Sequence, residues 1–128
     1  MSTEKILKDK AILIVDDEAD ILDSITEQLD MCRIYRAMDY EIALQLMAGF
    51  KFDIVILDVM GVRGFELLKK SVSKGFPTVM LTAHALTPEA LKESIQLGAV
   101  SFLPKEMMVD LDVYLADVIT GSKKMVWT

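Results

Sequence analysis

The chain has 128 residues, of which 52% are hydrophobic and 27% charged, with a net charge of −6. This balance fits one soluble domain, and the acidic excess offers no basic stripe for nucleic acid. No apolar run approaches the ~18 residues of a membrane span, and the N-terminus has no secretion signal. We therefore expect a cytoplasmic protein that binds neither nucleic acid nor membrane, and the single cysteine fits that reducing compartment.

Short apolar runs predict five β-strands. Residues 11–15 (AILIV) are continuous and rich in β-branched residues, whereas residues 33–37 (RIYRA) alternate polar and apolar as an edge strand does. Residues 53–57 (DIVIL) and 78–82 (TVMLT) are again continuous, and residues 100–103 (VSFL) could form the other edge. The continuous runs indicate strands in the middle of a sheet that is covered on both faces.

Segments of helical period separate these strands. Apolar stripes predict five helices, which run in chain order through Ile21/Leu22/Ile25/Leu29, Ile42/Ala43/Leu46/Met47, Phe65/Leu67/Leu68, Leu91/Ile95 and Leu111/Leu115/Val118/Ile119. The fourth helix has a clear start, because Thr87 suits the N-cap and Pro88 the first helical position. Gly98 is expected to end it.

The alternation of strands and helices predicts the fold. Five βα units in a row imply a parallel sheet with helices on both faces, joined by right-handed crossovers. The two edge-like strands, the second and the fifth, favour the strand order 2-1-3-4-5. The expected fold class is therefore α/β, a flavodoxin-like (βα)5 three-layer sandwich with a parallel five-stranded sheet.

Polar residues mark the carboxyl ends of the predicted strands. Asp16 and Asp17 follow the first strand, Asp58 ends the third, Thr82 ends the fourth, and Lys105 lies just past the fifth. The carboxyl ends of parallel strands meet at one edge of the sheet, and ligands bind there at the point where the strand order reverses. One aspartate after a strand is usually a turn or cap residue, but five converging polar residues favour a functional site.

The chemistry of these side chains favours phosphoryl transfer. Clustered carboxylates repel one another unless a cation lies among them, and oxygen ligands favour a hard cation, with Mg²⁺ as the best candidate. A carboxylate can also act as a nucleophile and form an acyl phosphate. The negative charge of the transferred group must then be balanced, for which Mg²⁺, Lys105 and Thr82 are available.

Six motifs follow one another in an order and spacing that are specific to one family, namely ILIVDDE, the A-x-x-x-E-x-A-L pattern of residues 37–44, DIVILDVM, GFELL, TVMLTAH and LGAVSFLPK. In these motifs the chain resembles the receiver domain of bacterial two-component response regulators, including the single-domain regulators of chemotaxis and phosphorelays. The resemblance implies a receiver domain over residues 9–120, followed by a C-terminal tail at residues 121–128.

The resemblance also implies a phosphoacceptor and a metal site. Asp58 would accept a phosphoryl group from a histidine kinase or a phosphotransfer protein. Asp16 and Asp17 would hold Mg²⁺ together with Asp58 and the backbone carbonyl of Met60. The protein would catalyse only its own Mg²⁺-dependent phosphorylation from a phosphodonor and its own dephosphorylation, and would otherwise not be an enzyme.

The same resemblance implies a conformational switch. Lys105 would pair with the phosphoryl group, Thr82 would hydrogen-bond to it, and Phe102 would turn inward together with Thr82. Phosphorylation adds about −1.5 to −2 charge, to which a lysine and a hydroxyl can respond by moving towards it. The altered surface would be the fourth helix, fifth strand and fifth helix, at about residues 87–119, where a downstream protein would bind.

The chain departs from the family pattern at three places. Gly64 comes six residues after the phosphoacceptor instead of eight, and the usual Met-Pro pair is missing from that turn. Pro104 precedes Lys105 and Glu106 follows it, whereas the family usually has a proline after the lysine. Tyr40 replaces a common glycine before the second helix.

Other functions remain open at this stage. The shortened turn leaves room for a degenerate receiver that acts as a phosphorylation-independent protein-interaction module, although all five site residues are retained. A phosphatase or hydrolase with an aspartyl nucleophile is disfavoured, because Met60 occupies the place of the second aspartate that such enzymes commonly carry. A flavin or nucleotide site is disfavoured because no Gly-rich loop follows the first strand.

Overall fold

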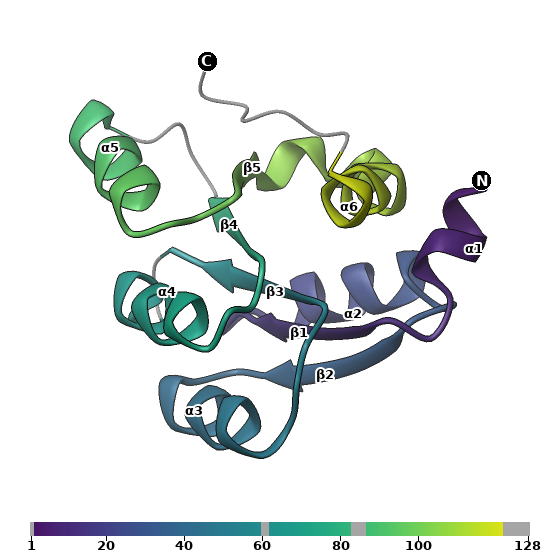
Figure 1. The fold of residues 1–128 in the computed structure, drawn as a ribbon, viewed down its shortest axis with the longest axis horizontal. Helices are drawn as coiled ribbons and strands as arrows, with labels where there is room; N and C mark the ends of the chain where they lie inside the picture. Colours follow the sequence, from purple (N-terminus) through teal and green to yellow (C-terminus); the bar gives the residue numbers. More distant parts are fainter. Residues whose placement is uncertain (1, 60–61, 83–86, 122–128) are drawn as a thin grey trace.

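The computed structural model describes residues 2–59, 62–82 and 87–121. Within these residues five parallel strands form one sheet in the order β2-β1-β3-β4-β5 (Figure 1). The strands are β1 (Ala11–Val15), β2 (Arg33–Ala37), β3 (Ile54–Asp58), β4 (Thr78–Thr82) and β5 (Ser101–Pro104). The predicted flavodoxin-like α/β fold and its strand order are confirmed, and two strands are shifted by one residue from their predicted bounds.

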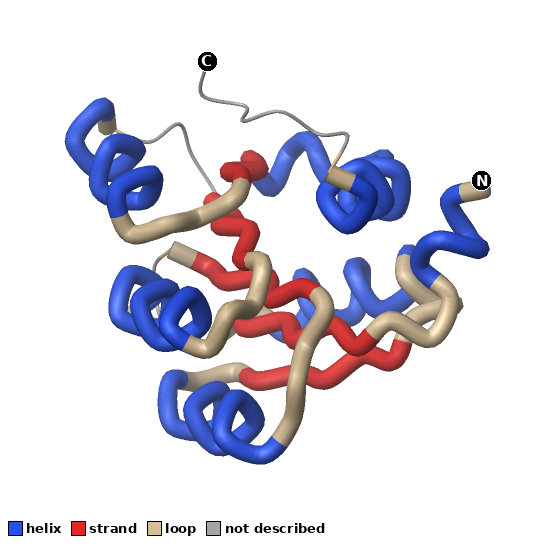
Figure 2. The backbone as a smooth tube through the Cα atoms, in the orientation of Figure 1, coloured by secondary structure: helices blue, strands red, loops and turns tan. Residues whose placement is uncertain are grey.

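Helices connect the strands and cover both sides of the sheet (Figure 2). They are α2 (Ala19–Gln28), α3 (Tyr40–Gly49), α4 (Gly64–Ser73), α5 (Pro88–Gln96) and α6 (Leu111–Thr120). Crossing a membrane requires a longer and more apolar helix than any found among the described residues.

Two further elements were not predicted from the sequence. The short helix α1 (Thr3–Leu7) precedes β1 and packs against α6, and the 3₁₀ helix η1 (Lys105–Asp110) joins β5 to α6. Helix α1 has one fully buried residue, Leu7. Both elements are too short for a helical period to be visible in the sequence, so only packing reveals them.

The sheet separates two hydrophobic cores. Helices α3, α4 and α5 cover one face, and α1, α2 and α6 cover the other (Figure 1). Strand β1 contributes to both, because Leu13 points to the first core and its neighbours Ile12 and Ile14 to the second. In each of the strands β1, β3 and β4 all five residues are buried. These strands therefore lack the alternation of polar and apolar residues that a half-exposed sheet shows.

The predicted boundaries of α5 are confirmed, but one residue of its predicted stripe faces outward. Thr87 Oγ1 accepts a hydrogen bond from the backbone N–H of Ala90 at 3.1 Å, and Gly98, with φ +99°, follows the end of the helix. Ile95 is 39% exposed, as is Ile42 of α3 at 41%, so neither belongs to the core. The apolar stripes of α3 and α5 are therefore only partly buried.

Candidate functional site

Four strands bring polar side chains to the carboxyl edge of the sheet. Asp16 directly follows β1, Asp58 is the last residue of β3, Thr82 is the last residue of β4, and Lys105 directly follows β5. The backbone N–H of Asp16 still donates to the carbonyl of the last residue of β2, at 3.1 Å, so the sheet fixes its position. These residues therefore meet at the reversal of strand order between β1 and β3, as expected.

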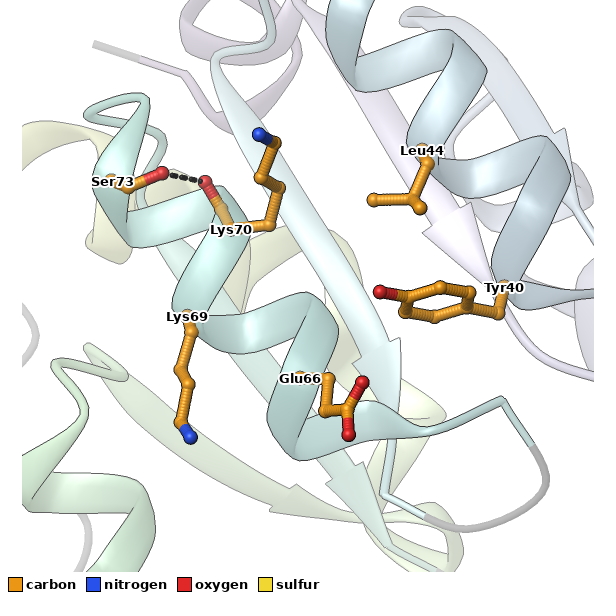
Figure 3. A pocket seen from close by; sticks show the side chains of 6 residues that line it. All are labelled: Tyr40, Leu44, Glu66, Lys69, Lys70 and Ser73. Carbon is orange, nitrogen blue, oxygen red and sulfur yellow. Dashed lines mark hydrogen bonds between the residues drawn. The ribbon is translucent and has the colours of Figure 1, made fainter.

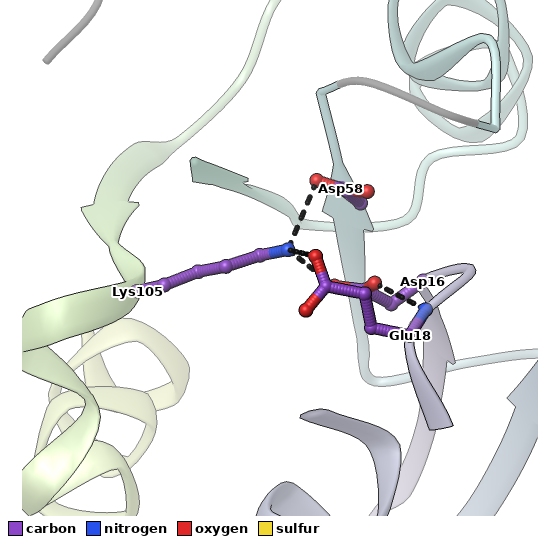
Figure 4. A network of polar contacts seen from close by, with 4 residues as sticks. All are labelled: Asp16, Glu18, Asp58 and Lys105. Carbon is purple, nitrogen blue, oxygen red and sulfur yellow. Dashed lines mark hydrogen bonds and ion pairs between the residues drawn. The ribbon is translucent and has the colours of Figure 1, made fainter. Parts of the chain in front are cut away.

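Lys105 lies at the centre of this cluster. Its Nζ is 3.0 Å from Asp16 Oδ2, 3.4 Å from Glu18 Oε1 and 3.5 Å from Asp58 Oδ1 (Figure 4). An ammonium group has three N–H donors, so one lysine can serve all three carboxylates. Glu18 was not among the predicted site residues, and its place directly after two aspartates was the only signal for it in the sequence.

The acidic side chains fit a hard cation. Asp16, Asp17 and Glu18 each offer a carboxylate oxygen, and these oxygens lie within 4.8 Å of one another. Asp16 Oδ1 accepts a hydrogen bond from the backbone N–H of Glu18 at 2.9 Å, whereas the buried Oδ2 accepts none and has only its ion pair with Lys105. An oxygen of that kind is a suitable ligand for Mg²⁺. Asp58 does not belong to this group of three carboxylates, and Lys105 connects it to the group.

The electrostatics of the cluster follow from burial. Burial raises the pKa of Asp58 to about 6, and the charge of Asp16 adds to this effect while Lys105 opposes it. Burial also raises the pKa of Asp16, against its hydrogen bond from Glu18 and its contact with Lys105. Burial lowers the pKa of Lys105, but the surrounding carboxylates together outweigh this and leave its pKa above the usual value. The site thus holds more negative charge than its one lysine neutralises.

Thr82 and Phe102, the two predicted switch residues, lie on adjacent strands. Thr82 is buried and pairs in register with Pro104, the residue before Lys105. Phe102 is buried in the core under α3, α4 and α5, and it pairs in register with Met80. Since side chains alternate along a strand, Thr82 is on the same face of the sheet as Met80 and Phe102.

A short turn joins Asp58 to α4. Residues 60–61 are outside the described residues, and so is the predicted metal ligand, the backbone carbonyl of Met60. Gly64 opens α4, and a Cβ at this position would lie 2.8 Å from Val59 Cα and against the backbone oxygen of Asp58. Only glycine permits this close approach of the first residue of α4 to the end of β3.

A second feature lies beside this turn but apart from the carboxylates. Arg63, with φ +57°, precedes α4, and its guanidinium carbon is 3.9 Å from the centre of the Tyr40 ring while the group also ion-pairs with Glu66. A groove of about 510 Å³ lies between α3 and α4, and it is lined by Tyr40, Leu44, Glu66, Lys69, Lys70 and Ser73 (Figure 3). The groove shares no residue with the cluster around Lys105.

Comparison with known proteins identifies the family. The chain matches the family model of the response regulator receiver domain over residues 12–115. The protein belongs to this family, and its fold and family place it in two-component signalling, in which receiver domains are generally switches and not enzymes.

A curated relative and two solved structures show how far the likeness extends. A protein of Vibrio cholerae serotype O1 named "Probable cyclic di-GMP phosphodiesterase" is 29% identical over 107 residues, which cover 78% of this chain and 24% of that protein. The chain thus spans about a quarter of that relative's length.

Two solved structures of response regulators are similar to this chain in fold. A response regulator from Thermotoga maritima superposes with a TM-score of 0.78 at 19% identity, covering 88% of this chain and 98% of that one. A response regulator protein from Burkholderia pseudomallei, determined with a phosphorylated aspartic acid, calcium ion and citrate, gives a TM-score of 0.75 at 18% identity, covering 89% and 71%.

Proposed function

We propose that the protein is a phosphorylation-dependent switch of a two-component system or phosphorelay, and that Asp58 accepts the phosphoryl group. The observation that carries the proposal is that Lys105 links the buried carboxylates of Asp16 and Asp58 at the reversal of strand order. The Burkholderia response regulator, which shares the fold, contains a phosphorylated aspartic acid and a calcium ion, and this supports the same chemistry here. The donor would be a histidine kinase or a phosphotransfer protein.

The residues of the cluster have complementary parts in the transfer. A carboxylate oxygen of Asp58 forms a bond to phosphorus as the P–N bond of the donor phosphohistidine breaks, and the electron pair of that bond stays on the imidazole nitrogen. Lys105 and the hydroxyl of Thr82 stabilise the negative charge of the phosphoryl oxygens. Asp16, Asp17 and Asp58 would hold Mg²⁺, which when bound supplies positive charge to the transferring group.

The signal would leave the site through β4 and β5. Thr82 and Phe102 lie on one face of the sheet, so a movement of the hydroxyl towards the phosphoryl group frees space next to the aromatic ring. The surface formed by α5, β5 and α6, at residues 87–119, would then bind a downstream protein. This surface carries exposed apolar side chains, which are Ile95, Val100, Val109 and Val113. We take residues 9–120 as the receiver unit and residues 121–128 as its tail.

The proposal is tested by phosphorylation in solution. Incubation with Mg²⁺ and a small acyl phosphate should add the mass of one phosphoryl group to the wild type and none to Asp58→Asn. Asp30→Asn is the matched control, because Asp30 is exposed and not part of the cluster, and it should be modified as the wild type is. An unmodified wild type that also binds no Mg²⁺ would contradict the proposal and favour a phosphorylation-independent interaction module.

A further inference from the structure

Glu18 makes one of the three contacts of Lys105, although the mechanism above gives it no part. Its Oε1 accepts a hydrogen bond from Lys105 Nζ at 3.4 Å, and its backbone N–H donates to Asp16 Oδ1 at 2.9 Å. The Glu18 side chain is 59% exposed, whereas those of Asp16 and Asp58 are 0% and 7% exposed. Of the three carboxylates, Glu18 alone can give up the lysine without leaving a buried charge unpaired.

The Lys105 ammonium contacts three carboxylates before phosphorylation. The shortest contact is with Asp16, at 3.0 Å, and the longest is with Asp58, at 3.5 Å. A phosphoryl group on Asp58 would add three strong acceptor oxygens at the end where the lysine has its longest contact. To donate to one of them, Lys105 has to move towards Asp58 and away from Asp16 and Glu18, and the exposed Glu18 is the partner that can be left unpaired.

We propose that Glu18 is a positioning residue, which retains Lys105 over Asp16 in the unphosphorylated protein and releases it when Asp58 is phosphorylated. This inference rests on the proposed function. Glu18 acts through the lysine and does not need to touch the reacting atoms. The contact between Glu18 and Lys105 exists only in the unphosphorylated protein. Glu18 therefore weakens the binding of a phosphoryl group by the free energy of one exposed ion pair.

The test compares the binding of fluoroberyllate, a phosphoryl mimic, at saturating Mg²⁺ by calorimetry. Glu18→Gln keeps the size of the side chain and removes its charge, so it should bind the mimic about two- to fivefold more tightly than the wild type. Glu106→Gln is the matched control, since Glu106 follows Lys105, is exposed, and forms no ion pair with the described residues. Its affinity should equal that of the wild type, and unchanged or weaker binding in Glu18→Gln would overturn the inference.

A double-mutant cycle shows whether Glu18 acts through the lysine. In a Lys105→Met background the effect of Glu18→Gln should disappear, whereas an effect of undiminished size would mean that Glu18 repels the anion directly and would overturn the inference. A wild type that binds no fluoroberyllate would contradict the proposed function itself, and with it this inference. Normal wild-type binding without an effect of Glu18→Gln would contradict only the inference.

Discussion

At the scale of single residues, the surroundings of Asp58 alter the acidity of its carboxyl group. Burial, with a further contribution from the charge of Asp16, raises its pKa from 3.8 to about 6. Because the folded protein therefore binds the Asp58 proton more tightly than the unfolded chain, this carboxyl favours the folded state fully below about pH 4. That contribution is lost as the pH rises through about 6. The charged carboxylate needed for phosphoryl transfer is thus kept at a cost to the stability of the fold.

The raised pKa predicts that protons compete with Mg²⁺. Lowering the pH from about 7.5 to about 5.5 should weaken Mg²⁺ binding by about fourfold, because only about a quarter of Asp58 is ionised at the lower value. Calorimetric titration at a series of pH values measures this. Asp58→Asn should bind Mg²⁺ more weakly but with a smaller pH dependence, and an affinity of the wild type that is constant across this range would contradict the role of Asp58 as a ligand.

At the scale of elements, α4 begins in close contact with the end of β3. A Cβ at Gly64, the first residue of α4, would lie 2.8 Å from Val59 Cα, so the helix backbone packs directly against the backbone that follows the strand. Arg63 lies in the left-handed region just before Gly64 and is held by Tyr40 and Glu66. Tyr40, the first residue of α3, thus contacts the residue that precedes α4.

Gly64→Ala should therefore damage both the fold and the site. The new Cβ would meet backbone atoms of Val59 at 2.8 Å, and backbone cannot give way as a flexible side chain does. We expect a loss of about 1–3 kcal/mol in the free energy of unfolding, measured by urea denaturation, together with slower phosphorylation. Gly49→Ala is the control, since nothing lies within 4 Å of a Cβ at this helical position, and it should leave stability unchanged or slightly raise it. Equal stabilities of the two variants would contradict the close approach.

At the scale of the whole molecule, two cores on either side of one sheet hold the site at its edge. Asp16 and Asp58, at the ends of β1 and β3, are buried, and α1 contributes Leu7 to the second core. Helix α1 has only five residues, so it is held by tertiary packing and not by its own helical stability.

Leu7→Ala should thus destabilise the entire domain. Leu7 is fully buried in the core with α6, so its truncation is expected to lower the free energy of unfolding by about 2–4 kcal/mol in urea denaturation. Lys5→Ala, on the exposed side of the same helix, should change it by less than about 0.5 kcal/mol. If both variants unfolded like the wild type, α1 would not be part of the cooperative unit.

Much of this architecture could be predicted from local sequence patterns. Runs such as AILIV and TVMLT are mostly apolar because their strands are buried on both faces, and RIYRA includes two exposed arginines because β2 is an edge. From these patterns follow the strand order and the placement of Asp16, Asp58, Thr82 and Lys105 at one edge of the sheet. Each pattern is set by neighbours within a few residues, which is why the sequence alone was sufficient. The functional roles of these residues remain predictions that the experiments above test.

Other features depend on distances between residues that are remote in the chain, so only the tertiary structure decided them. Glu18 and Lys105 are 87 positions apart, and their contact depends on how β1 and β5 end relative to one another. The packing of α4 on β3 and α3 likewise decides two contacts. These are the close approach of Gly64 to Val59 and the contact of the Arg63 guanidinium with the Tyr40 ring. The sequence by itself determined which residues reach the edge of the sheet, because burial and alternation are local. The structure decided which partner holds the lysine, because an ion pair forms wherever packing brings the two charges together.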